Sequence, residues 1–182
     1  LYDAGCRTLQ LDDCTWGAVV GNAAAQRYEK LGSLKEVKEQ LLKVNNLALA
    51  EKPDDMTVNT HICRGNYHST YFTSGPYDTV ADYVFAKENV SRLYLEYDDA
   101  RSGGFAPLAK VSKDKKVVLG LITTKSPALE DKNSVIARIR ETEKYIPLER
   151  LYLSPQCGFA SCEIGNKLNE DEQWAKIALV RE

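Results

Sequence analysis

A histidine and a cysteine stand two residues apart at the end of an apolar run, in the stretch NTHICRGN at residues 59–66. Residues i and i+2 of a β-strand point to the same face, so His61 and Cys63 could reach one point. Both are common zinc ligands, and zinc usually takes three or four ligands from a protein. Glu96 and Cys157 also end apolar runs, and we take these four residues as a candidate ligand set.

Ordinary structural roles compete with metal binding for single residues of these types. A lone cysteine is most often a small buried apolar side chain, and we expect this of Cys6, Cys14 and Cys162. A lone histidine is more often structural than a ligand, and we expect this of His68. For the set of four, spacing alone supports zinc and a structural explanation equally, because His-x-Cys is a short motif.

Five short apolar runs rich in β-forming residues would position these side chains. They lie at residues 7–13, 56–63, 92–99, 116–123 and 150–157. Helical patterns, with apolar residues three and four apart, lie at 33–51, 77–88 and 133–146, with a further helix expected at 169–182. Ser33 and Glu36 form the signature of a capping box. The alternation of strands and helices predicts parallel βα units.

Polar and potentially ligating residues gather where the predicted strands end: Asp12–Asp13, His61, Cys63, Glu96, Thr123–Thr124 and Cys157. A (β/α)8 barrel builds its active site at this end of its strands, and it takes about 250 residues, or roughly 31 per unit. We therefore expect an α/β protein with the last five βα units of a TIM barrel. An open doubly wound sheet is the alternative, because its ligands also bind at strand carboxyl ends.

The beginning of the chain bears on its organisation. It starts LYDAGCRTLQLDD, without Met, and has the pattern of a helix end that runs directly into a strand. We expect residues 1–182 to be the C-terminal part of one catalytic barrel domain whose N-terminal strands are missing. Only a closed barrel has no sheet edges, so we expect the isolated chain to be unstable, to associate, or to belong to a longer chain.

Composition limits the partners that this chain could have. The formal net charge is −2, so no basic field favours nucleic acid. No apolar run approaches the roughly 18 residues of a membrane span. The five cysteines are odd in number and irregularly spaced, which favours reduced thiols over a disulfide framework. We therefore expect a cytoplasmic protein that binds neither nucleic acid nor a membrane.

Four longer stretches occur in the order HICRGN, LEYDDARSGGFAPL, LGLITTKSPALED and LERLYLSPQCGFAS. Together they resemble the C-terminal barrel of cobalamin-independent methionine synthase and, more closely, its short single-barrel relatives, over nearly the whole chain. The resemblance implies that His61, Cys63, Glu96 and Cys157 bind one catalytic zinc ion. The stretch LQLD is similar to the family's strand whose aspartate holds the amino group of homocysteine, which points to Asp12.

Two positions depart from the family's pattern. The family has a proton-donating histidine in an Asp-Ile-His-Ser-Pro stretch, where this chain reads TTKSP and has Lys125. The position that contacts folate in the long enzymes is Ala18 here. The resemblance thus implies a zinc-dependent methyltransferase that converts a homocysteine-like thiol to methionine, with Lys125 at the proton-donor position. Its methyl donor would be methylfolate or a methyl-corrinoid.

The expected chemistry suits such a ligand set. A thiol is a poor nucleophile until it loses its proton, and a coordinated thiol is deprotonated outright. Alternative functions are another zinc-activated thiol alkylation, such as thiol addition to an epoxide, or a non-catalytic barrel with structural zinc. Near the ligands, Arg64, Asn66 and Arg101 would either bind a carboxylate or face solvent. The stretch RSGGFAPL lacks the spacing of a phosphate loop and predicts a tight turn before a short helix.

Overall fold

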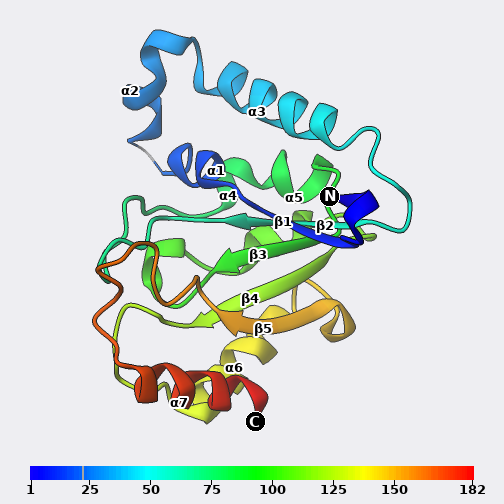
Figure 1. Cartoon of the computed structure of the whole chain (residues 1–182). Helices are drawn as coiled ribbons and strands as arrows, with labels where there is room; N and C mark the ends of the chain where they lie inside the picture. The colour runs from blue at the N-terminus through cyan, green and yellow to red at the C-terminus, as the bar shows by residue number, and fades with distance from the viewer. Residues whose placement is uncertain (22) are drawn as a thin grey trace.

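The computed structural model describes residues 1–21 and 23–182. At its centre is a sheet of five parallel strands in the order β1-β2-β3-β4-β5 (Figure 1). The strands are β1 Thr8–Asp12, β2 Thr57–Ile62, β3 Arg92–Glu96, β4 Lys116–Ile122 and β5 Leu151–Pro155. Each of the five apolar runs therefore forms a strand, as the sequence predicts.

Helical segments connect the strands and precede the first. The α-helices are α1 Cys14–Ala18, α2 Ala24–Tyr28, α3 Leu34–Ala48, α4 Asp78–Ala81, α5 Val84–Lys87, α6 Lys132–Thr142 and α7 Glu170–Arg181. Short 3-10 helices span Tyr2–Ala4, Glu29–Leu31, Ala100–Ser102, Ala106–Lys110 and Leu148–Arg150. Within the described ranges, no helix combines the length and the hydrophobicity that crossing a bilayer demands.

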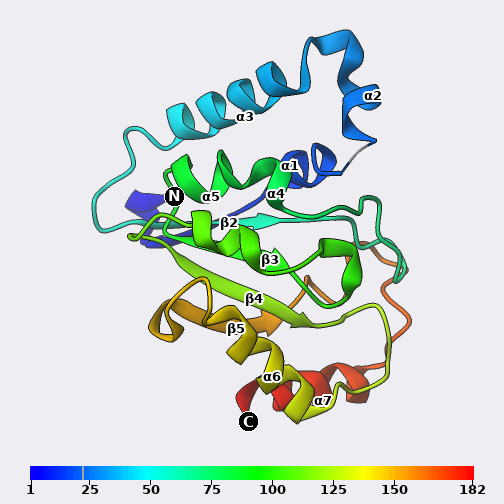
Figure 2. The ribbon, with the colours of Figure 1, turned by 180° about the vertical axis from the view of Figure 1, so that it is seen from behind.

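The strand order distinguishes between the two folds that the sequence left open. A doubly wound sheet reverses its strand order at a switch point, whereas here spatial order follows chain order from β1 to β5. Figure 2, which views the molecule from behind, shows α4, α5 and α6 over one face of the sheet. This is the arrangement of consecutive βα units in a (β/α)8 barrel, and the doubly wound alternative is wrong.

The two faces of the sheet differ in polarity. Leucine and valine side chains of the strands pack under the helices, among them Val58, Leu93, Leu95, Val117 and Leu119. The alternating positions carry polar or aromatic side chains, because neighbouring residues of a strand point to opposite faces. These include Gln10, Asp12, His61, Tyr94 and Ser154, which line one cavity. The apolar face forms the core, and the polar face forms the inside of the partial barrel.

Helix α3 begins as its sequence predicts. The Glu36 N–H donates to Ser33 Oγ at 3.3 Å, and the Ser33 N–H donates to Glu36 Oε2 at 2.8 Å. This capping box satisfies two N–H groups that a helix start leaves without partners. Apolar residues of the helix at positions 34, 37, 41 and 42 pack against the core.

The single helix expected at 77–88 is two short helices, α4 and α5. The Tyr83 N–H donates to the Val80 carbonyl at 3.0 Å, an i to i−3 bond that tightens the chain between them. The apolar pattern still faces inward, because its members are all buried: Tyr77, Val80, Ala81, Val84 and Phe85. The periodicity identified the buried face correctly and missed the break.

Candidate metal centre

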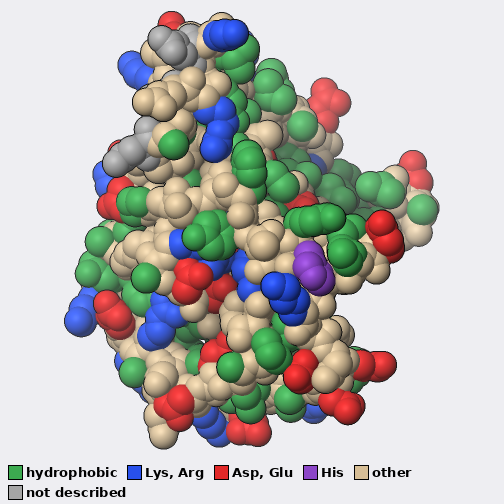
Figure 3. Space-filling model, turned by 90° about the vertical axis from the view of Figure 1, so that its left-hand side faces the viewer, with side chains coloured by type: hydrophobic (Ala, Val, Ile, Leu, Met, Phe, Trp, Pro, Cys, Tyr) green, Lys and Arg blue, Asp and Glu red, His purple; other side chains and the backbone are tan. Residues whose placement is uncertain are grey.

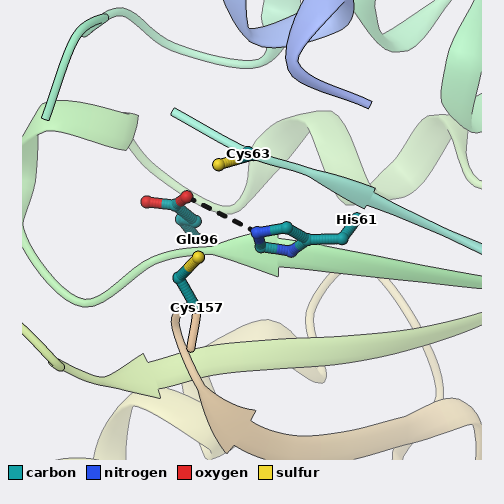
Figure 4. A group of neighbouring side chains, drawn as sticks. All are labelled: His61, Cys63, Glu96 and Cys157. Atoms are coloured by element: carbon teal, nitrogen blue, oxygen red, sulfur yellow. Dashed lines mark ion pairs between the residues drawn. The ribbon is translucent and has the colours of Figure 1, made fainter. Parts of the chain in front are cut away.

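The four candidate ligands meet at the carboxyl ends of the strands (Figure 4). His61 is near the end of β2, Cys63 follows that strand, Glu96 ends β3, and Cys157 comes two residues after β5. One potential ligand atom of each lies within 4.8 Å of those of the other three. The structure thus brings together all four residues of the set, and their binding of a metal stays a prediction.

Gly120 in β4 allows this convergence, although the sequence analysis did not single it out. A Cβ at this position would lie 2.7 Å from the Cα of Gln156 and 2.8 Å from the Leu95 carbonyl oxygen. The β4–β5 pairing is also irregular between Gly120 and Ile122. The missing side chain lets the segment after β5 approach β3, which places Cys157 beside Glu96. A glycine inside a strand can mark such a close backbone approach.

Glu96 is held by several donors at once. Oε1 accepts from the Arg64 N–H at 2.8 Å, and Oε2 accepts from Arg101 Nη2 at 2.7 Å. Lys125 Nζ lies 4.0 Å from Oε2, and His61 Nε2 lies 3.7 Å from Oε1. Burial raises the pKa of Glu96, while Lys125, Arg64 and Arg101 pull it down. The carboxylate therefore has a fixed orientation and nearby positive charge.

The two thiols of the group shift each other's pKa in opposite directions. Cys157 donates to Cys63, which lowers the pKa of Cys63 to about 3 against the effect of burial. The same hydrogen bond raises the pKa of Cys157. The Gly65 N–H also donates to Cys63 Sγ at 3.4 Å. One sulfur is therefore poised as a thiolate, which is the form that binds metals.

The residues present fit a bound metal ion. Among the described residues, His61 Nε2 is buried and has no hydrogen-bond partner. Burial opposes protonation of this ring, but Cys63 and Glu96 outweigh it and raise the pKa of His61. A buried polar atom without a partner is costly, and an ion between the imidazole, the carboxylate and the thiols would satisfy it. Mixed nitrogen, sulfur and oxygen donors of this kind are those that zinc takes.

Asp12 lies on the same rim as the four ligands. It ends β1 and pairs in register with His61 of β2. Both residues line a cavity of about 380 Å³ with Tyr94, Ser154 and Cys157. The role of helix cap belongs to the neighbouring Asp13, whose carboxylate accepts from the Thr15 N–H at 3.0 Å. Burial, then the nearby Cys63, raises the pKa of Asp12.

Lys125 lies where the sequence places it, just beyond β4. Besides its approach to Glu96, its Nζ donates to Asn66 Oδ1 at 3.3 Å. Asn66 in turn donates to the Gly158 carbonyl at 2.6 Å, next to Cys157. Asn166 donates to Asn66 Oδ1 at 2.9 Å and to the Thr124 carbonyl at 2.8 Å. These bonds connect the loops after β2, β4 and β5 around the four ligands.

Of the two alternatives that the sequence left open for the arginines near the site, facing solvent is wrong, because both guanidinium groups are buried. Arg64 is 1% exposed. Its guanidinium lies over the Tyr77 ring and donates to the Gly75 carbonyl at 2.7 Å. Arg101 pairs with Glu96 and Asp98 at 2.7 Å each, and also with Asp99. Both arginines support the loops and the carboxylate of the site.

Cysteine burial also differs from the expectation. Cys14 is exposed, while Cys6 and Cys162 are half-buried. Cys14 is the first residue of α1, beside the carboxyl end of β1, so its side chain lies at the rim. Its thiol belongs to a second group with Asp12 and Cys63. His68 is held in its loop, with Nδ1 3.1 Å from the Gly165 carbonyl, in agreement with a structural role.

The face of the molecule at the carboxyl ends of the strands carries both positive and negative side chains. Figure 3 views the molecule from this side, and Lys and Arg side chains are interspersed there with Asp and Glu. The tight turn and short helix predicted in RSGGFAPL correspond to the 3-10 helices Ala100–Ser102 and Ala106–Lys110. They carry Arg101 toward Glu96.

Comparison with known proteins places this chain in a family. The model of the family described as "Cobalamin-independent synthase, Catalytic domain" matches residues 1–170. The protein YxjG of Bacillus subtilis is 49% identical over 183 residues, which is all of this chain and 48% of that protein. A 5-methyltetrahydropteroyltriglutamate–homocysteine methyltransferase of Blochmanniella pennsylvanica is 25% identical over 159 residues, 81% of this chain and 18% of that protein.

Solved structures agree with these matches. The crystal structure of a putative vitamin-B12 independent methionine synthase from Listeria monocytogenes superposes with a TM-score of 0.74 at 35% identity. The match covers 99% of this chain and 49% of that one. The chain thus spans about half the length of the curated relatives that it matches over nearly all its residues.

Proposed function

The chain belongs to the family of cobalamin-independent synthase catalytic domains, and from this premise we propose that it carries the site of a cytoplasmic, zinc-dependent methyltransferase. The substrate is a thiol amino acid of the homocysteine type, and the product is methionine. The convergence of His61, Cys63, Glu96 and Cys157 carries the proposal. Zinc bound there would hold the substrate sulfur as a thiolate, the nucleophilic form.

The chain's own residues prepare this site for a thiolate. Arg101 and the Arg64 N–H hold the Glu96 carboxylate in place. Cys63 ionises readily and Cys157 lies beside it. Two thiolates and a carboxylate make the ligand set electron-rich. The substrate sulfur would therefore keep electron density for attack on a methyl carbon.

Asp12 selects an amino acid in this proposal. A buried ammonium group requires a charged or strongly accepting partner. Asp12 shares the cavity of about 380 Å³ with His61 and Cys157, so a small molecule could contact the carboxylate and the metal group together. This favours a substrate with an ammonium group over a simple thiol in an epoxide–thiol transfer. Access from the cavity also favours catalysis over a closed structural zinc site.

Lys125 faces the leaving group in this proposal. It occupies the position of the family's proton donor, and its Nζ lies 4.0 Å from Glu96 Oε2. In this role the Lys125 ammonium group would contact the methyl donor, which is a methylfolate or a methyl-corrinoid. Three further βα units, pairing with β1 and β5, would complete the barrel around the cavity, since a (β/α)8 barrel has eight strands.

Metal analysis of the purified chain tests the proposal. We expect about one zinc ion per chain, as for a single four-ligand site. His61→Ala and Cys157→Ser each remove a ligand and should lose stoichiometric zinc, which inductively coupled plasma mass spectrometry would measure. Cys162→Ser is the matched control, because Cys162 belongs to neither group of potential ligands. Stoichiometric zinc in either ligand variant would sink the assignment.

A further inference from the structure

A second group of potential ligands lies beside the first. The ligand atoms of Asp12, Cys14 and Cys63 lie within 4.8 Å of one another. Cys63 belongs to both groups, so its sulfur lies between them. Asp12 and Cys14 are exposed, whereas three of the four residues of the first group are buried. The second group is therefore the outer one, open to the cavity side of the rim.

Local structure holds these three residues together. Asp12 and Cys14 flank Asp13, which caps α1 through the Thr15 N–H and accepts from Asn45 Nδ2 at 2.6 Å. Helix α1 packs directly on the end of β2, because a Cβ at Gly17 would lie 2.1 Å from the Cys63 carbonyl oxygen. The start of α1 and the end of β2 are therefore in contact. This backbone contact keeps Asp12 and Cys14 close to Cys63.

The three groups suit a cation in their chemistry. The ligand atoms of Asp12 and Cys14 both lie near Cys63 Sγ. A carboxylate and two thiolates repel one another at this separation, and a cation between them would offset that repulsion. Metal binding deprotonates the coordinated thiols.

We propose that Asp12, Cys14 and Cys63 form a second metal position, adjacent to the first group and sharing the Cys63 thiol with it. Two thiolates and one carboxylate favour a thiophilic divalent ion such as zinc or cadmium. Zinc is tetrahedral with zinc–sulfur bonds of about 2.3 Å, which puts two sulfurs on one ion about 3.8 Å apart. Atoms within 4.8 Å of one another reach that spacing by a side-chain movement of at most about 1 Å.

The outer ion would compete with the substrate. This consequence, unlike the site itself, rests on the proposed function, in which Asp12 binds the substrate ammonium group. A carboxylate that coordinates a cation is not free to pair with another positive charge. Excess metal would therefore occupy the amino-acid pocket, while the inner ion stays in place.

Cadmium titration of the metal-free full-length chain tests the second position. Thiolate-to-cadmium charge transfer in the ultraviolet reports sulfur ligation, and equilibrium dialysis reports stoichiometry. We expect two steps, with the second ion bound more weakly because it has fewer ligands. Cys14→Ser should remove the second step and leave the first. Cys6→Ser should keep both, since Cys6 lies before the amino end of β1 and donates to the Thr8 carbonyl.

Further variants separate this proposal from the proposed function. Cys157→Ser removes a ligand of the inner position only, so the Cys14-dependent step should remain in that variant. If the inner step were absent from the wild type and the Cys14-dependent step present, the proposed function would fail and the second position would stand. A wild type in which no step depends on Cys14, whether one step or two are seen, would overturn the second position.

Discussion

Two buried glutamates, Glu88 and Glu96, are both 0% exposed but lie in contrasting surroundings. Glu96, at the rim of the polar face, receives a hydrogen bond from the Arg101 guanidinium and lies near Lys125. Glu88, in the layer of helices, receives hydrogen bonds from Trp16 Nε1 at 2.8 Å and Asn45 Nδ2 at 3.1 Å. A guanidinium donates to the carboxylate of Glu96, whereas the hydrogen-bond donors of Glu88 are neutral and the cation nearby, Lys115, only lowers its pKa.

This difference separates a site residue from a structural one. Burial raises the pKa of Glu88 to about 7, and the nearby Asp13 adds to the rise. Glu88 can therefore keep its proton inside the protein near neutral pH, and it joins α1, α3 and the end of α5. Glu96 is oriented by donors that favour its ionised form. Only the second arrangement keeps a carboxylate ready for a metal ion.

The same isosteric substitution should have opposite effects at the two positions, and the largest effect is expected at Glu96. Glu96→Gln removes the charge that Arg101 faces, and the Arg101 side chain is 4% exposed. Removing one partner of a buried ion pair costs about 3–5 kcal/mol. Since Arg101 keeps Asp98 and Asp99, we expect a loss of about 3 kcal/mol in the free energy of unfolding.

Urea denaturation of the metal-free chain at pH 8 would measure this loss. Asp82→Asn is the control, because the Asp82–Lys110 pair is exposed on both sides and such pairs contribute at most about 1 kcal/mol. A loss in Glu96→Gln no larger than that in Asp82→Asn would show that the ion pair between Glu96 and Arg101 does not stabilise the fold.

Glu88→Gln should instead relieve a pH-dependent cost. In the unfolded chain this carboxyl ionises near its ordinary pKa of 4.5, and in the folded chain near about 7. Its contribution to stability is therefore fully present below pH 4.5 and is lost as the pH rises to about 7. The difference amounts to about 3 kcal/mol. Glutamine cannot ionise, so the variant should escape this loss.

Urea denaturation at pH 4.5 and at pH 8 would compare the two proteins. We expect the variant to gain about 3 kcal/mol relative to the wild type between these two pH values. Parallel pH profiles would show that Glu88 titrates alike in the folded and unfolded chain, and the contrast with Glu96 would then disappear.

The smallest expected effect concerns the exposed carboxylate of the rim. Asp12→Asn should keep the zinc ion of the inner position, because Asp12 is not one of its four candidate ligands, and should alter stability by no more than about 0.5 kcal/mol, as for most surface substitutions. It should weaken homocysteine binding by about 1.5–3 kcal/mol, the range for a hydrogen bond to a charged group. Calorimetric titration with homocysteine and with a thiol that lacks the amino group would measure this. Equal losses for the two thiols would remove Asp12 from the amino-acid pocket.

The sequence predicted those parts of the fold and site that depend on local pattern. Strand alternation and residue type located His61, Cys63 and Glu96 at strand ends. The Ser33–Glu36 capping box spans three residues and was equally visible. The pairing of Glu88 with Trp16 joins residues 72 apart, and no periodicity encodes that. The exposure of Cys14 likewise depends on where α1 begins. A single cysteine in the sequence does not indicate whether its side chain is buried or exposed.

Gly120 shows that a metal site can constrain a residue that is not one of its ligands. The residue contacts no ion, yet even a methyl group there would collide with the backbone that carries Cys157. A search of variants for altered metal preference would therefore find few tolerated changes at this position. A substitution at Gly120 would keep all four ligands and still move Cys157 away from the other three. The ligand residues thus determine the chemistry of the site, whereas residues such as Gly120 determine the spacing between the ligands. Mutation can therefore change one property without the other.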